Sequence, residues 1–253
     1  MLEQIASVNP WLIGIALNTF LLAIAWLLPK KLLTPAGYFN AWLLGVLVWG
    51  SLGWRGYGVV MFYFLVGSAV TRIGMAEKEA QGIAEKRSGM RGPENVWGSA
   101  LVGAVCGIAT LFLPSPWQEL FVLAYVASFC TKLSDTTASE VGKAYGKRTF
   151  LITTLQPVAR GTEGAVSLEG TIAGIVASAV IAVVGWAIGL ITPWGIILCM
   201  IAAFVATNVE SLIGATLQDK FSWLTNEVVN IINTFIGAVV AVLLAWLTLG
   251  FGN

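Results

Sequence analysis

The stretch that decides the fold is residues 38–74, which read YFNAWLLGVLVWGSLGWRGYGVVMFYFLVGSAVTRIG. It holds two apolar runs, 38–54 and 57–74, separated only by Arg55 and Gly56. Each run approaches the length of about 20 apolar residues that an α-helix needs to cross the hydrocarbon core of a bilayer. Because so short a connection forces the chain to turn back at once, the stretch predicts a tight hairpin of two membrane-spanning helices.

Six more apolar runs of similar length flank this hairpin. They are residues 11–28, 97–113, 117–133, 167–191, 194–213 and 228–249. Of all residues 57% are hydrophobic and only 11% are charged, against about 25% charged in soluble domains. We therefore predict an all-α fold, a polytopic transmembrane helical bundle of about eight spans that forms a single integral membrane domain over residues 1–253. Residues 1–10 lack a basic segment, so the first run is expected to be a retained span and not a cleaved signal peptide.

The distribution of charge predicts how the bundle is oriented. With eight spans, the loops 29–37, 73–96, 134–166 and 214–227 lie on one side of the membrane. All 14 Lys and Arg residues except Arg55 belong to this side or to its helix ends, and so do all 13 acids except Glu3 and Glu119. Loops rich in Lys and Arg stay in the cytoplasm. We therefore expect these loops on the cytoplasmic side and both termini on the opposite side.

The composition also excludes several classes of function. A net charge of +1 gives no basic field for nucleic acid, and the absence of His removes the usual general base and the Ser-His-Asp triad. A metal site must then use oxygen ligands, which favours Mg²⁺, Mn²⁺ or Ca²⁺ over Zn²⁺. The three cysteines lie inside apolar runs, where they are expected to be buried and to form no disulfide: Cys106, Cys130 and Cys199.

The first polar cluster is SDTTASEVGK at residues 134–143, directly after the fifth run. If the helix continues, Asp135 and Ser139 share one face, and Thr136 and Glu140 share another. Carboxylates near membrane depth are costly without a partner, and oxygen ligands of this kind suit Mg²⁺ that carries phosphates. Ser134 and Lys143 complete the candidate site residues here. The alternative is a solvated helix end.

The second cluster is RGTEGA at residues 160–165, just before the sixth run. Arg160 is expected to clamp a phosphate with its planar guanidinium. Glycines let a backbone approach a ligand closely, so Gly161 and Gly164 are candidate binding residues together with Glu163. The order of a Walker A loop is absent, and a glycine turn before a helix is common for structural reasons alone.

Two further clusters lie near the last two runs. Asn208, Glu210 and Ser211 end the seventh run. The other cluster is a row of amides at i, i+4 and i+7, on one face of the eighth helix: Asn226, Asn230 and Asn233. Such a stripe entering lipid is expected to line a polar interior. The alternative is hydrogen bonding between helices that only holds them together.

The loop from residue 72 to residue 95 carries Arg72, Lys78, Lys86, Arg87 and Arg91. This loop is either a flap that grips phosphates or simply a basic cytoplasmic loop. Arg72 is the favoured functional residue because it lies nearest the membrane. All the polar clusters fall on the same side, which indicates one site where a polar substrate from the cytosol meets an apolar one in the bilayer.

At these clusters the sequence resembles a known family, the plastid phytyl-phosphate kinases of tocopherol synthesis, which also includes the transmembrane protein 19 group. The segments that carry the resemblance are residues 131–136, 139–147, 160–165, 167–171, 210–211, 213–215, 218–220 and 226–233. It implies transfer of a phosphoryl group from a nucleoside triphosphate, CTP or UTP, to phytyl phosphate, which gives phytyl diphosphate. More distantly, the architecture looks like the CTP-dependent polyprenol kinases.

From the residues together with the resemblance, we expect catalytic roles for Asp135, Glu140 and Arg160. Magnesium is expected on Asp135 and Glu140, with Glu210 as a weaker third ligand. The acceptor is expected to be phytyl phosphate or a related isoprenyl monophosphate, its head near Asn226, Asn230 and Asn233 and its tail between the later helices. A cyanobacterial or plastid-type membrane and a homo-oligomer are also expected.

Two alternatives stay open at this point. Carboxylates within membrane helices also mark the ion pathways of transporters, although these acids gather at one face and do not form a ladder across the membrane. The other alternative is a CTP-dependent polyprenol kinase or cytidylyltransferase that acts on another lipid.

Overall fold

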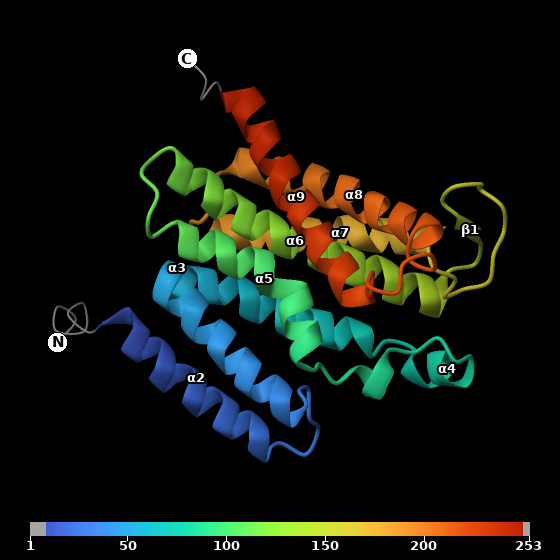
Figure 1. Ribbon diagram of the computed structural model, residues 1–253, viewed down its shortest axis with the longest axis horizontal. Coiled ribbons are helices and arrows are strands. Elements are labelled where there is room, and N and C mark those ends of the chain that lie inside the picture. The colour runs from blue at the N-terminus through green and yellow to red at the C-terminus, as the bar shows by residue number, and fades with distance from the viewer. Residues whose placement is uncertain (1–8, 250–253) are drawn as a thin grey trace.

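The computed structural model describes residues 9–249, which form a bundle of helices (Figure 1). The helices are α2 (Pro10–Leu27), α3 (Pro35–Thr71), α4 (Met75–Ala80), the 3-10 helix η1 (Lys86–Gly89), α5 (Pro93–Ala109), α6 (Trp117–Tyr145), α7 (Leu168–Ala187), α8 (Pro193–Thr216) and α9 (Asn226–Leu249). Two short antiparallel strands, β1 (Thr149–Leu151) and β2 (Ala165–Ser167), pair Thr149 with Ser167. The helical bundle is confirmed, whereas this small hairpin was not predicted. Glu3 and the two termini lie outside the described residues.

Several helices begin at residues whose chemistry favours a helix start. Pro35 and Pro193 occupy the first turns of α3 and α8, where a missing N–H leaves no hydrogen bond unmade. The side chain of Thr34 accepts a hydrogen bond from the Gly37 N–H, and that of Ser167 accepts one from the Gly170 N–H. Each such cap satisfies a donor that the first helical turn leaves free.

Helix α3 doubles back within its own length, which confirms the predicted hairpin. A straight helix of 37 residues would be about 55 Å long. Instead, Arg72 just after its end donates a hydrogen bond of 3.2 Å to the carbonyl of Lys31, just before its start. The turn is made at Gly53, whose φ of 61° and ψ of −156° break the helix. The bend therefore falls two residues before the predicted Arg55-Gly56 connection.

Five of the described helices are long and apolar enough to cross a membrane: α2, α3, α7, α8 and α9. Helix α5 has only 17 residues, and α6 continues twelve residues past its expected end at 133 and carries polar side chains there. The expected count of eight spans therefore stays a prediction. Large apolar side chains such as Phe20, Phe112 and Leu247 are exposed, as they would be against lipid.

Helix α6 forms the centre of the bundle, in contact with α3, α5, α7, α8 and α9 (Figure 1). Tyr125, Val126 and Phe129 on it are fully buried. Helix α7 approaches α6 closely because Gly170 and Gly174 face it: a Cβ atom at Gly170 would lie 2.5 Å from the carbonyl oxygen of Ala138. The three cysteines are buried and free, as predicted.

Candidate functional site

A polar cavity of about 970 Å³ lies at the end of the bundle where the basic loops meet. Helices α6, α7, α8 and α9 contribute lining residues, and so do residues 82–95 and the segment 161–167. The segments around the cavity also touch one another. A Cβ atom at Gly161 would lie 2.7 Å from Cγ2 of Ile83, and Nη1 of Arg160 lies 3.6 Å from Oε1 of Glu77 on α4. The polar clusters, far apart in the sequence, are thus gathered around one space.

Most of the candidate site residues line this polar cavity. They are Ser134, Asp135, Thr136, Ser139, Glu140, Lys143, Gly161, Glu163, Gly164, Asn208, Glu210, Ser211, Asn226 and Asn230. Three of the candidates, Arg72, Arg160 and Asn233, do not belong to the lining.

A buried lysine joins two of the clusters. Lys132 is only 7% exposed, and its Nζ donates hydrogen bonds of 2.6 Å to Asp135 Oδ2 and 2.7 Å to Asn230 Oδ1. An ammonium group held at this depth needs such partners. Lys132 was not among the candidate residues, although a lysine in the last turn of an apolar run is a signal that could have identified it. It places a fixed positive charge on the wall of the cavity.

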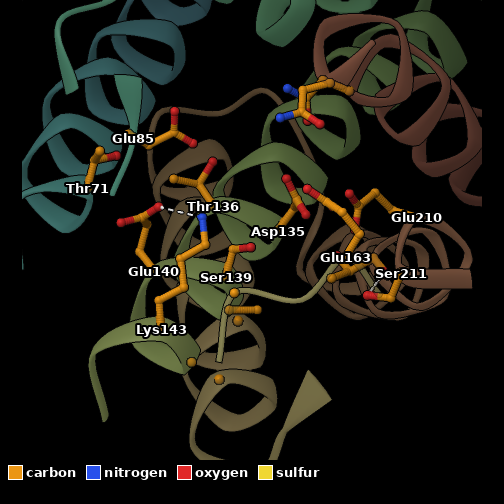
Figure 2. A pocket seen from close by; sticks show the side chains of 18 of the residues that line it. Thr71, Glu85, Asp135, Thr136, Ser139, Glu140, Lys143, Glu163, Glu210 and Ser211 are labelled. Carbon is orange, nitrogen blue, oxygen red and sulfur yellow. Dashed lines mark hydrogen bonds and ion pairs between the residues drawn. The ribbon is translucent and has the colours of Figure 1, made fainter. Parts of the chain in front are cut away.

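Three carboxylates from three different segments gather beside this lysine. Asp135 lies on α6, Glu163 in the loop before β2 and Glu210 on α8, and Figure 2 shows their carboxyl groups close together. Partial burial of its carboxyl group raises the pKa of Glu163, and the negative charges of Asp219, Glu85 and Asp135 raise it further, against the effect of Lys143. A divalent cation would relieve this crowding of negative charge.

The carboxylates of the cavity suit Mg²⁺, because this ion does not need the protein to supply all of its ligands. Among residues 9–249 no group of three or more Cys, Asp or Glu side chains is arranged so that it could hold a metal ion. Magnesium is usually held by one or two carboxylates, with waters and substrate phosphates supplying its other ligands. One or two of Asp135, Glu163 and Glu210 would therefore be the protein ligands of Mg²⁺ in this cavity.

Glu140 does not lie with these acids, contrary to the prediction that it shares a metal with Asp135. Five residues along a helix correspond to a rotation of about 140° relative to Asp135, and Figure 2 shows Glu140 on the other side of α6. Glu140 is only 2% exposed and forms a buried ion pair with Lys78. The Nζ of Lys143 lies 3.6 Å from its Oε1. The Nζ of Lys78 also donates to the carbonyl of Thr71 at 2.8 Å. Glu140 thus anchors α4 to α6.

Of the three candidates outside the lining, the two arginines hold parts of the protein together. Arg160 donates a hydrogen bond of 3.2 Å to the carbonyl of Ala144 at the end of α6. Arg72 donates a hydrogen bond of the same length to the carbonyl of Lys31. Asn233 is completely buried in the bundle, and neither atom of its amide group has a hydrogen-bond partner among the described residues. Their positions do not favour the phosphate and lipid-head contacts predicted for them.

The two candidate glycines have positive φ angles and lie in close contact with neighbouring segments. Gly161 and Gly164 have φ angles of 80° and 74°, which L side chains rarely adopt. A Cβ atom at Gly164 would lie 2.4 Å from the Cβ of Ala215 and 2.6 Å from the carbonyl oxygen of Ser211. Gly164 thus lets the loop before β2 pack against α8, while Gly161 lets it pack against Ile83.

A second basic residue of the site belongs to the 72–95 loop, of which the sequence favoured only Arg72. Arg91 lines the cavity and donates a hydrogen bond of 2.7 Å from Nη1 to the hydroxyl of Tyr63. Its guanidinium carbon lies 5.0 Å from the centre of the Tyr63 ring and 5.9 Å from that of Phe64. Nothing in the sequence separates Arg91 from the other basic residues of its loop; only its contact with α3 distinguishes it.

Comparison with known proteins places the chain among membrane proteins. The family model described as integral membrane protein DUF92 matches residues 18–238. An uncharacterized membrane protein of Synechocystis sp. is 69% identical over 92% of this chain and 90% of its own length. The chloroplastic protein VTE6 of Arabidopsis thaliana is 46% identical over 96% of this chain and 74% of its own length. An uncharacterized membrane protein of Methanocaldococcus jannaschii is 29% identical over 92% of this chain and 95% of its own length. No solved structure matches.

Proposed function

The chain belongs to the DUF92 family of integral membrane proteins, and on that premise we propose that it is a membrane-embedded lipid-phosphate kinase. The family resemblance of its motifs is confirmed by the 46% identity to chloroplastic VTE6, and this supports an enzyme of the phytyl-phosphate kinase type. Its acceptor is phytyl phosphate or a related isoprenyl monophosphate, and its donor is a nucleoside triphosphate, with CTP and UTP as the first candidates. The product is the isoprenyl diphosphate.

The observation that carries this proposal is the composition of the polar cavity. It combines carboxylates from α6, α8 and the 152–164 loop with Lys132, Lys143 and Arg91, at the end of the bundle where the chain leaves its apolar helices. Phosphoryl transfer requires positioning and neutralisation of charge more than it requires a strong base. A site without histidine can therefore perform it.

The reaction assigns a distinct task to each group. An oxygen of the acceptor phosphate attacks the terminal phosphorus of the nucleotide, the bond from that phosphorus to the bridging oxygen breaks, and the nucleoside diphosphate leaves. Lys132, fixed by Asp135 and Asn230, offers positive charge to the phosphate oxygens. One or two of Asp135, Glu163 and Glu210 would hold Mg²⁺, which would supply additional positive charge for the nucleotide phosphates. Lys143, at the outer edge of the cavity, attracts the nucleotide from the cytosol.

The transporter alternative receives less support from this arrangement. The acids and lysines of the cavity lie at one end of the bundle, and the charged residue Arg55 at the turn of α3 contacts only the carbonyl of Gly189 and the ring of Trp54 among the described partners. A transport pathway would require polar groups that continue across the membrane.

A panel of donors and acceptors tests the proposal. Purified protein in lipid nanodiscs is incubated with each of four γ-labelled nucleoside triphosphates and with phytyl phosphate, geranylgeranyl phosphate, phytol or phosphatidic acid. We expect labelled isoprenyl diphosphate from the two monophosphates, a requirement for Mg²⁺, and the highest rate with CTP or UTP. Conversion of phytol or phosphatidic acid while both isoprenyl monophosphates stay inert would overturn the lipid assignment.

A further inference from the structure

A second cavity, of about 270 Å³, lies among α2, α3 and α5, away from the helices that carry the acids. Leu21, Ala41, Leu44, Val60 and Ala100 are among the apolar side chains that line it. Ligand pockets commonly enclose about 300–1,000 Å³, so this apolar cavity has room for part of a single hydrocarbon chain.

The apolar cavity meets the polar one at three residues: Tyr63, Arg91 and Ser99 line both. The guanidinium of Arg91 donates a hydrogen bond to the Tyr63 hydroxyl, and none of the ion pairs among residues 9–249 includes Arg91. An arginine without a carboxylate partner, at the junction of a polar and an apolar space, suits the phosphate of an amphipathic ligand.

The far parts of the apolar cavity explain how a long chain could enter it. Ile24, Leu28 and Leu65 line it and are 44%, 51% and 53% exposed, so one side opens toward lipid. At its deep end Tyr57 donates a hydrogen bond of 3.0 Å to buried Asn18. This closed end limits how far a chain can reach, and the open side lets any excess length pass into the bilayer.

We infer that the apolar cavity holds the hydrocarbon tail of the acceptor, with the acceptor phosphate at Arg91. This inference rests on the proposed kinase function and names where the lipid binds. It places the tail between the early helices α2, α3 and α5, and not beside the amides of α9. The head then faces Lys132 and the carboxylates across one continuous space, while a two-chain phospholipid would need more room than the apolar cavity offers.

Photocrosslinking locates the tail directly, whether or not the lipid is converted. Protein in nanodiscs is mixed without nucleotide with an isoprenyl monophosphate that carries a diazirine in its third isoprene unit, irradiated, digested and sequenced by mass spectrometry. We expect adducts on α2, α3 and α5, which unlabelled phytyl phosphate suppresses and phytol does not. Specific adducts confined to α7, α8 and α9 would overturn the tail site. Adducts on the early helices in a protein that makes no diphosphate would support the tail site and reject the kinase.

A substitution that fills the apolar cavity tests the same site by kinetics. Ala41→Phe should raise KM for phytyl phosphate by about tenfold and leave kcat nearly unchanged. The five-carbon dimethylallyl phosphate fills much less of the cavity, so its KM should rise by a smaller factor. Ala187→Phe adds the same ring at an exposed position of α7 that lines neither cavity; it should alter KM by less than about twofold.

The role of Arg91 is tested by separating lipid binding from nucleotide binding. Arg91→Gln should raise KM for the lipid phosphate by about tenfold or more while KM for the nucleotide stays the same. Arg91→Lys should recover only part of the loss, because an ammonium cannot replace the planar fork. An Arg91→Gln protein that folds and keeps its KM for the lipid would contradict the placement of the phosphate.

Discussion

Glu140 illustrates how a carboxylate that looks catalytic in the sequence can serve the fold. Residues 134–143 place Asp135 and Glu140 in one polar run, and both line the polar cavity. The buried partner Lys78 comes from α4, 62 residues earlier in the chain, so no local pattern could reveal the pair. The same holds for Lys132 and Asn230, 98 residues apart. Contacts of this kind depend on helix packing and not on spacing.

The first prediction follows from this buried pair. Glu140→Gln should lower the free energy of unfolding by about 3–5 kcal/mol, because Lys78 is left buried without its counter-charge. The double variant Lys78→Met/Glu140→Leu, which removes both charges, should recover much of that loss. Thermal unfolding of the purified proteins in detergent measures both. A Glu140→Gln protein with wild-type stability and no Mg²⁺ dependence would instead restore Glu140 as a metal ligand.

The second prediction concerns the dependence of metal binding on pH. The pKa of Glu163 is raised above its ordinary value of 4.5, so this carboxyl stays protonated to higher pH than a free one. A protonated carboxyl is a poor metal ligand. The apparent affinity for Mg²⁺ should therefore weaken as pH falls through the raised pKa, and the Glu163→Gln variant should bind more weakly but show a flatter pH dependence. Both proteins are titrated with Mg²⁺ in the presence of the same nucleotide, so protonation of the nucleotide affects the two pH profiles equally. Parallel pH profiles for the two proteins would contradict the role of Glu163.

At the scale of elements, the helix starts and the α3 hairpin could be predicted because they depend on local chemistry. Proline, threonine and glycine mark the ends of helices in the sequence. The helix from Trp117 continues through the polar cluster to Tyr145, twelve residues past the end of its apolar run. The strands β1 and β2 are only three residues each. Their pairing is part of the packing of the 146–167 segment against α6 and α8, and a three-residue strand has too little periodicity to be recognised.

The third prediction tests the turn of α3. Gly53→Ala should lower stability by about 1–3 kcal/mol, because the φ of 61° and ψ of −156° are strained for any residue with a Cβ atom. The added methyl itself meets nothing within 4 Å, so the cost comes from the backbone alone. Gly58→Ala is the matched control on the same helix: its Cβ would have its nearest neighbour at 3.6 Å, and it should be neutral or stabilising. Equal losses in the two variants would argue against a strained turn.

At the scale of the whole molecule, the convergence of polar loops at one end could be predicted from charge alone. These loops carry many similar basic residues, so the sequence does not reveal which of them line the cavity and which stabilise the fold. Arg91 lines the cavity, whereas Arg160 bonds the carbonyl of Ala144. The apolar cavity could not be predicted either, because its wall is assembled from α2, α3 and α5 and most of its residues are apolar ones that any membrane helix could carry.

The fourth prediction assigns the two ends of the bundle to the two sides of the membrane. Arg148, exposed in the loop after α6, should lie on the cytoplasmic side, and Arg55, exposed at the turn of α3, on the opposite side. Arg148→Cys and Arg55→Cys proteins are labelled with a membrane-impermeant maleimide in intact cells and in inverted vesicles. The native cysteines are buried and should give little background. Labelling of both positions from the same side would contradict this topology.

The central claim is that this bundle transfers the terminal phosphoryl group of a nucleotide to a lipid phosphate in the polar cavity. One measurement addresses it most directly: purified protein in nanodiscs receives phytyl phosphate, Mg²⁺ and CTP labelled either at the α- or at the γ-phosphorus. We predict γ-label in the lipid product, α-label only in released CDP, and a rate lowered by about 100-fold or more in Asp135→Asn, which keeps the shape of the side chain and removes its charge. Appearance of α-label in the lipid would instead identify a cytidylyltransferase, and the absence of either label from the lipid, with Asp135→Asn indistinguishable from wild type, would contradict the claim.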